Sequence, residues 1–260
     1  MLACKDTDIF SYTVNSSFTQ ENTPMNILIT NDDGIEAHGI MRLVAAAKKY
    51  GNIWVVAPES QRSAASHSIT LRTSITAKKF SFPVEGVNAY AVSGMPADCV
   101  RIACRGLMPV KPDIIFSGIN FGYNAGTDVQ YSATMGAAME GIFQGVPSIA
   151  FSEGFSEDSR QLTDEHLDEI LKLVIPKANT GHVVNVNFPD CNKADFVGIL
   201  ENRICSKTCI FDDEYTKKTL SDGTLEFMVN GQYQEIAESN SDLHALFTKH
   251  ISIGPVYNIG

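Results

Sequence analysis

The amino-acid sequence predicts an α/β fold in which a mostly parallel sheet is covered by helices on both faces. Short apolar runs without polar alternation are typical of strands that are buried on both sides. Segments with apolar residues three and four positions apart separate these runs and predict amphipathic helices. From about residue 195 onward, turn dipeptides lie between β-prone runs and indicate a hairpin region.

The expected strands and helices alternate along the first three quarters of the chain. Apolar runs predict strands over residues 26–30, 53–57, 113–117, 148–151 and 183–187. Helical periodicity predicts helices over residues 40–47, 97–105, 135–143 and 167–174. Residues 69–92 show β-like alternation, which turn signals at Pro83 and Gly86 interrupt. Repeated strand–helix–strand units build a parallel sheet, because parallel neighbours need a long crossover connection.

Two segments differ from this pattern. Residues 1–24 are polar and have no continuous apolar core, so we expect a disordered or non-native leader and not a secretory signal. Residues 195–260 form a hairpin-rich extension, in which Asp222-Gly223 and Asn230-Gly231 are expected to mark turns. Residues 25–260 are expected to form one α/β domain that includes this extension.

Composition excludes several classes of partner. The formal net charge of -10 argues against a nucleic-acid backbone or an anionic membrane surface as the main partner. No apolar run reaches the length that a membrane-spanning helix needs. The six cysteines are scattered, which is typical of reduced thiols in a cytosolic protein. We therefore expect a cytoplasmic protein that binds neither nucleic acid nor membranes.

Three polar loops follow the predicted strands, at residues 31–34, 59–68 and 118–134. Ligands of open parallel sheets bind beyond the carboxyl ends of the strands, where these loops can meet. The first loop contains Asp32 and Asp33, whose like charges are tolerable if a divalent cation lies between them and a substrate anion. Alternatively, the pair only caps the next helix or ends a turn.

The other two loops carry hydroxyl, amide and imidazole groups. The second loop includes Ser63 and His67, and by itself it is equally typical of a solvated polar loop. The third loop is rich in glycine and asparagine but lacks the G-K-[ST] ending of a phosphate-binding P-loop. Ser132 and Thr134 stand at the start of the following helix, where hydroxyls and free N–H groups can bind phosphate. Either residue can also serve as an ordinary helix cap.

Five ordered segments of the sequence resemble a known family. They are NILITNDDGIEAHGI, VVAPESQRSAASHSIT, SGMPADCVRIA, SGINFGYNAGTDVQYSATMGAAMEG and VNVNFP. In this order and spacing they resemble the SurE survival-protein family of metal-dependent nucleotide phosphatases. The resemblance extends from Met25 to about residue 190 and continues weakly through SDLHAL and HISIGPV near the end.

The resemblance implies a Rossmann-like, three-layer core and one divalent cation per subunit, Mg²⁺ or Mn²⁺. Its ligands in the family correspond to Asp32, Asp33, Ser63 and Asn120. All four supply oxygen, which suits a hard cation and not zinc. By analogy with the family, the chain is expected to form a homodimer or homotetramer through its C-terminal extension.

The implied activity is removal of phosphate from nucleoside monophosphates, as in a 5′-nucleotidase, with 3′-nucleotides and polyphosphate as further substrates. Asp32 and Asp33 are the expected catalytic carboxylates, with Asp32 as the base that activates water. His67 is expected either to protonate the leaving oxygen or only to brace its loop.

The phosphate group is expected to bind at Asn124, Ser132 and Thr134. Ser66 and Ala133 stand where the family usually has glycine, so phosphate has to approach a Cβ at residue 133. These departures concern substrate preference and rate, because neither position is an expected metal ligand.

Three other functions compete with this interpretation. A Mg²⁺-dependent receiver-like signalling domain needs a phosphoacceptor Asp at the end of a later strand, where this chain has Ser117-Gly118. A serine hydrolase of the α/β type needs a G-x-S-x-G turn, which does not occur in the chain. A nucleotide-binding protein without turnover remains compatible with the motifs.

Overall fold

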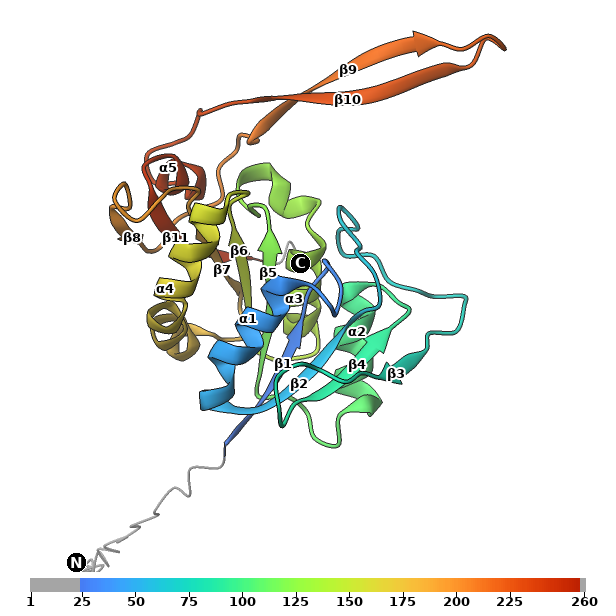
Figure 1. The fold of residues 1–260 in the computed structure, drawn as a ribbon, viewed down its shortest axis with the longest axis vertical. Helices are drawn as coiled ribbons and strands as arrows, with labels where there is room; N and C mark the ends of the chain where they lie inside the picture. The colour runs from blue at the N-terminus through green and yellow to red at the C-terminus, as the bar shows by residue number, and fades with distance from the viewer. Residues whose placement is uncertain (1–23, 258–260) are drawn as a thin grey trace, which may run out of the picture.

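A nine-stranded mixed sheet and a separate two-stranded sheet make up the strands of the computed structural model, which describes residues 24–257 (Figure 1). Residues 1–23, and with them almost all of the predicted leader, lie outside the described residues, as do residues 258–260. In the described part of the chain, no helix is long and apolar enough to cross a membrane.

Six parallel strands form the centre of the large sheet. They are β4 (Asn88–Val92), β2 (Gly51–Pro58), β1 (Met25–Thr30), β5 (Ile114–Phe121), β6 (Ser148–Glu153) and β7 (Val183–Phe188), in this spatial order. The prediction of a mostly parallel sheet is therefore confirmed. From β1 the chain first builds β2 and β4 on one side and then β5 to β7 on the other. The direction reverses between β1 and β5, and the carboxyl ends of these two strands form the place where such sheets bind ligands.

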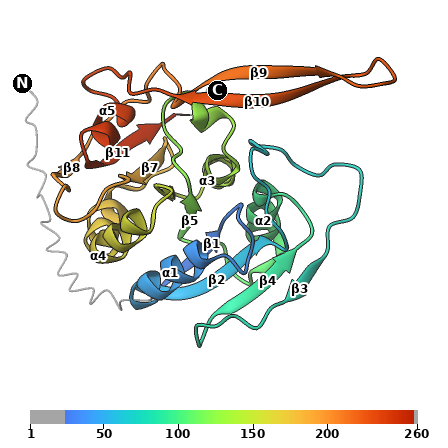
Figure 2. The same cartoon turned by 45° about the horizontal axis from the view of Figure 1, so that its top comes forward.

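Helices cover both faces of the sheet and complete three layers (Figure 2). The long helices are α1 (His38–Ala47), α2 (Pro96–Ile102), α3 (Ala133–Phe143) and α4 (Glu157–Val174). The 3₁₀ turns span Lys48–Tyr50, Gly126–Gln130 and Ile175–Lys177, and a π-helical turn, Ala103–Leu107, extends α2. Strand β1 contributes Ile27 and Ile29 to the apolar cluster beneath α1 and α4, and Leu28 to the cluster beneath α2 and α3. This alternation explains why the strand is apolar throughout.

Two elements are longer than the sequence predicts. Strand β5 continues through Phe121, into the segment expected to be a loop, because Asn120 and Phe121 pair with Ser152 and Glu153 of β6. Helix α4 begins at Glu157, ten residues before the apolar periodicity predicts. Its first turns are polar, and the side chain of Ser156 caps them by accepting a hydrogen bond from the amide of Ser159.

The C-terminal part of the chain both completes the large sheet and builds a projecting hairpin. The short strand β3 (Ala77–Lys79) forms one edge of the sheet, and β8 (Gly198–Leu200) and β11 (His250–Val256) extend the other, beside helix α5 (Asp242–Phe247). Strands β9 (Phe211–Thr219) and β10 (Leu225–Tyr233) form an antiparallel hairpin that projects away from the body in both views (Figures 1 and 2). The predicted turn at Asn230-Gly231 is wrong, because both residues pair with β9 inside β10.

Candidate metal and phosphate site

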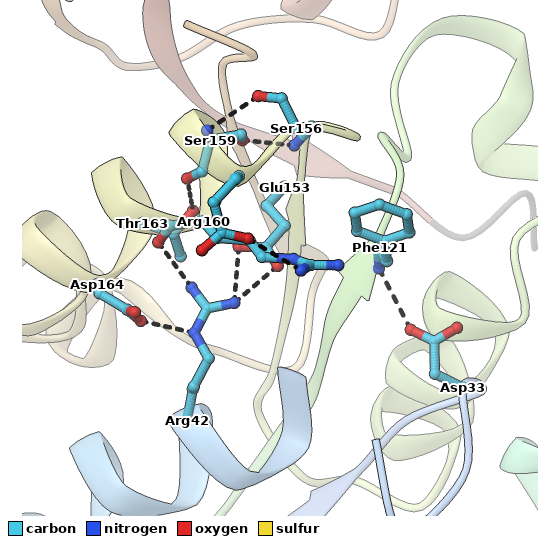
Figure 3. A network of polar contacts seen from close by, with 11 residues as sticks. Asp33, Arg42, Phe121, Glu153, Ser156, Ser159, Arg160, Thr163 and Asp164 are labelled. Atoms are coloured by element: carbon cyan, nitrogen blue, oxygen red, sulfur yellow. Dashed lines mark hydrogen bonds and ion pairs between the residues drawn. The ribbon is translucent and has the colours of Figure 1, made fainter. Parts of the chain in front are cut away.

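Backbone and side-chain contacts join three loops beside the carboxyl ends of β1 and β5. The carboxylate of Asp33 accepts hydrogen bonds from the amide of Phe121 and from the Gln61 side chain, both at 3.2 Å (Figure 3). The carbonyl of Asp32 accepts a hydrogen bond of 2.7 Å from the amide of Arg62. The loops after β1, β2 and β5 thus meet at the pair of aspartates. Sequence reasoning missed Gln61, although it lies within the predicted polar loop.

Asp32 is a buried carboxylate in an unfavourable electrostatic setting. Its side chain lies at the carboxyl end of β1, is 5% exposed, and accepts a hydrogen bond from the hydroxyl of Thr134. The pKa of Asp32 is raised to about 6: burial is the main cause, the Thr134 hydroxyl acts in the opposite direction, and the charge of Asp33 adds to the increase. Burial also raises the pKa of Asp33. A cation between the two carboxylates would remove this cost, which is the first sign that the residues fit a metal ion.

The neighbouring donors fit a hard cation. Among residues 24–257, no three His, Cys, Asp or Glu side chains are grouped so that they could hold a metal ion. A metal ion at the aspartates must therefore complete its shell with neutral oxygens, which Mg²⁺ and Mn²⁺ accept. The amide nitrogen of Asn120 donates to the carbonyl of Gly122 at 2.8 Å, which leaves its oxygen available. Ser63 is exposed and directly follows Arg62, whose amide contacts Asp32.

The start of α3 lies against Asp32. Ser132 is the N-cap, and its hydroxyl accepts a hydrogen bond of 3.0 Å from the amide of Met135. The hydroxyl of Thr134 donates a hydrogen bond to the carboxylate of Asp32. The carbonyl of Thr134 accepts a hydrogen bond of 2.8 Å from the hydroxyl of Ser117. The free N–H groups of the first turn of this eleven-residue helix therefore lie close to the carboxylate pair.

Asn124 lies deeper than a phosphate ligand would. Its side-chain amide donates to the Ser152 hydroxyl at 2.7 Å, and its backbone amide donates to Asn187 at 2.8 Å. Asn185 and Asn187 both donate to its carbonyl. The structure thus places Asn124 in a buried polar network that holds the loop after β5 onto β6 and β7. The sequence shows the asparagines but not their contacts, since they are about sixty residues apart.

His67 is turned toward the middle of α3. Its Nε2 lies 2.9 Å from the carboxylate of Glu140, and its ring packs against Phe143 at 5.1 Å between centroids. Glu140 is six residues beyond Thr134, which corresponds to roughly 9 Å along a helix axis. The structure therefore brings together Asp32, Asp33 and Thr134, and it pairs the imidazole of His67 with Glu140.

The loop that carries His67 has two non-glycine residues in the left-handed backbone region. Ala64 has a φ of 54° and Ser66 a φ of 53°. Such conformations cost of order 1–2 kcal/mol each and are kept only where other contacts hold them. Ser66 makes two such contacts. Its backbone amide donates a hydrogen bond to the carbonyl of Tyr131 at 3.0 Å, and its hydroxyl donates one to the carbonyl of Gln130 at 2.7 Å. These bonds fix the second loop onto the third.

A buried ion pair supports the site from the side of α1 (Figure 3). Arg42 contacts the carboxylate of Glu153 at 2.7 Å and that of Asp164 at 2.6 Å. The carbonyl of Glu153 accepts a hydrogen bond of 2.9 Å from Gly122, just after the strand end that contacts Asp33. Sequence reasoning missed this network, because Arg42 and Glu153 are more than a hundred residues apart.

Taken together, these features define a doubly wound α/β protein with an oxygen-lined, acidic site beside a helix N-terminus, the kind of place where a divalent cation and a phosphate group bind together. The model of the family described as "Survival protein SurE" matches residues 27–209. The chain belongs to the SurE family.

Individual relatives agree with this assignment. A protein named "5'-nucleotidase SurE" from Clostridium botulinum strain 657 is 38% identical over 237 residues, covering 90% of this chain and 93% of the relative. The protein of the same name from Heliobacterium modesticaldum is 36% identical, covering 90% and 86%. The crystal structure of the SurE protein from Aquifex aeolicus superimposes with a TM-score of 0.77 at 31% identity, covering 90% and 94%.

Proposed function

We propose that this protein is a metal-dependent 5′-nucleotidase, which releases inorganic phosphate from nucleoside monophosphates. The names of its relatives support this activity. The observation that carries the proposal is the pair of the buried Asp32 and the half-buried Asp33, held by two neighbouring loops and the start of α3. 3′-Nucleotides and polyphosphate present the same terminal phosphate group and are further candidate substrates.

Asp32, Asp33, Ser63 and Asn120 would hold one Mg²⁺ or Mn²⁺ per subunit. When bound, the cation supplies charge that offsets the developing charge on the phosphate group. Asp33 is fixed by Phe121 and Gln61, whereas Asp32 has only one of its oxygens bonded to Thr134. Asp32 therefore has an oxygen that can accept the proton of the attacking water.

The N–H groups at the start of α3 hold the phosphate, together with the hydroxyls of Ser132 and Thr134. Asn124 acts from behind, by fixing the loop. We assign His67 a bracing role, because its imidazole is occupied by Glu140. A His67→Gln variant distinguishes the two roles: loss of the basic limb of the pH–rate profile would assign it the role of general acid, and an unchanged profile supports bracing.

The proposal is tested by measuring phosphate release from a set of nucleoside monophosphates with Mn²⁺ or Mg²⁺. We expect Asp32→Asn to lower kcat by about 10²–10⁴-fold, and EDTA to abolish activity that added Mn²⁺ restores. Asp168→Asn, at a half-exposed carboxylate of α4 that contacts Lys49 and Tyr50, is the matched control and should be fully active. A chain that binds nucleotides but releases no phosphate would be a binding protein, and an active Asp32→Asn variant would show that the site is placed wrongly.

The hairpin supports self-association, and we propose that it pairs with a second copy in a homodimer or homotetramer. One of its faces carries Leu225, Phe227, Val229 and Tyr233 of β10 with Phe211 and Tyr215 of β9, all exposed. The other face is mainly polar. Exposed apolar faces of this kind mark protein contacts.

Two further proposals concern the chain as a whole. Residues 25–260 form one domain, since β8 precedes the hairpin in sequence, β11 follows it, and both join the large sheet. Limited proteolysis that separates a stable fragment ending before β8 would contradict this.

A cytoplasmic location is supported by five free cysteines in the described residues, as expected in a reducing compartment. Cell fractionation checks it.

A further inference from the structure

A cavity of about 240 Å³ lies between the loop after β6, helix α5 and the base of the hairpin. Its wall includes Tyr123, Phe155, Asp190, Phe211, Tyr233 and Lys249. We propose that this cavity binds the nucleoside part of the substrate and that the ring of Phe155 stacks on the base. The inference rests on the proposed function, because it assumes a nucleotide substrate whose phosphate binds at the aspartates. The cavity would then hold the nucleoside part of that substrate.

The cavity is adjacent to the candidate metal site. A Cβ placed at Gly122 would lie 2.8 Å from Cε1 of Phe155 and 3.8 Å from Nδ2 of Asn120, so the ring and this expected ligand both lie close to Gly122. The ring of Phe155 also packs edge-on against that of Phe121 at 5.7 Å between centroids, and the amide of Phe121 contacts Asp33. Phe121 thus connects the two places, because its amide contacts Asp33 and its ring packs against Phe155 in the cavity wall.

The lining suits a flat heteroaromatic ring. Phe155 is 53% exposed, whereas Phe151 of β6 and Phe188 of β7 are fully buried. Tyr123 packs against Phe155 on one side, and Tyr233 packs against Phe211 and Phe247 on the other. Aromatic rings stack on every base through its π-face and therefore give affinity without strict base selection.

A few polar groups accompany these rings, as in most small-molecule sites. The carboxylate of Asp190 accepts a hydrogen bond of 3.1 Å from the amide of Phe155 and another from the Ser156 hydroxyl, which holds the ring in place. The ammonium group of Lys249 makes only a long contact of 3.4 Å with the carbonyl of Asp190. Lys249 is therefore free to donate to a ribose hydroxyl or to an acceptor on the base.

The cavity can be tested without catalysis, because a nucleoside has no phosphate. Binding of adenosine and guanosine to the full chain is measured by calorimetry in EDTA. We expect Phe155→Ala to weaken binding by about 5- to 150-fold, the range that loss of one stacked base gives, and Phe155→Tyr to restore it. Tyr257→Ala is the matched control, because it removes an exposed ring that follows β11 and lies outside the cavity wall. Undetectable binding of both nucleosides to the unmodified chain, or unchanged binding by Phe155→Ala, would overturn the proposal.

Steady-state kinetics with Mn²⁺ separate this inference from the proposed function. We expect Phe155→Ala to lower kcat/KM for AMP and to leave that for glycerol phosphate, which has no base, unchanged. Equal losses on both substrates would overturn the stacking role and leave the nucleotidase intact. A chain that binds adenosine through Phe155 but hydrolyses neither ester would refute the nucleotidase and keep the cavity.

Discussion

The site at the sheet edge and the β9–β10 hairpin are held in place by opposite means. Asp32 is almost completely buried, and the loops around it are bonded to one another. Every residue of β9 and β10 is exposed, and each strand has only the other as its partner. An isolated two-stranded hairpin is marginally stable in water. The site is thus organised by contacts within one chain, whereas the exposure of the hairpin supports its proposed contact with a second copy.

Charges on the apolar face of the hairpin should produce the largest effect. We expect the double variant Phe227→Asp and Val229→Asp to weaken self-association by more than about 4 kcal/mol, roughly a thousandfold, because unpaired carboxylates would be buried in the contact. Light scattering after gel filtration measures the mass. Met228→Asp is the control, since Met228 is equally exposed but lies on the opposite face. Equal masses for both variants would show that the apolar face is not the contact.

Loss of the ion pair beneath the site should have a smaller effect that is confined to the body. Arg42→Met leaves the Glu153 carboxylate, 3% exposed, without its partner. We expect the free energy of unfolding to fall by about 3 kcal/mol, as for other broken buried pairs. Lys172→Met removes a surface pair with Asp168 and should cost less than about 1 kcal/mol. Urea denaturation measures both, and similar losses would contradict the buried character of the first pair.

The smallest effect concerns Asp32 in the metal-free protein. Its pKa is raised from 3.8 to about 6 on folding, so the folded state binds the proton more tightly than the unfolded state. The contribution of the protonated Asp32 to the free energy of unfolding is fully present below pH 4, and it is lost as the pH rises through 6. In EDTA, Asp32→Asn should therefore be more stable than the unmodified chain by about 2–3 kcal/mol at pH 8, with the difference vanishing near pH 4. A constant difference across this range would contradict the assignment.

The sequence predicts the sheet well and the site only in part. Apolar runs locate β1, β2, β6 and β7, because strands buried on both faces leave no ambiguity of pattern. The polar loops and the aspartate pair are also visible in the sequence, since they directly follow those strands. The far end of β5 is not visible in the sequence. Its glycine and asparagine residues favour a loop, but pairing with β6 extends the strand.

Side-chain direction explains the other differences. His67 and Asn124 lie in the expected loops, yet the first turns to Glu140 and the second to Ser152. Both partners lie on other elements, and no local pattern indicates them. Phe155 shows the same limit: its exposed ring lies close to Gly122, and only the folded chain reveals this contact.

The position of β11 has a consequence for synthesis. This last strand of the large sheet pairs antiparallel with β7 and parallel with β8, so β8 reaches the sheet only through it. While the ribosome is still making the hairpin, β7 therefore presents a row of unpaired backbone groups, and β8 has no neighbour. Arrival of the final strand covers this edge, which until then is open to pairing with other nascent chains.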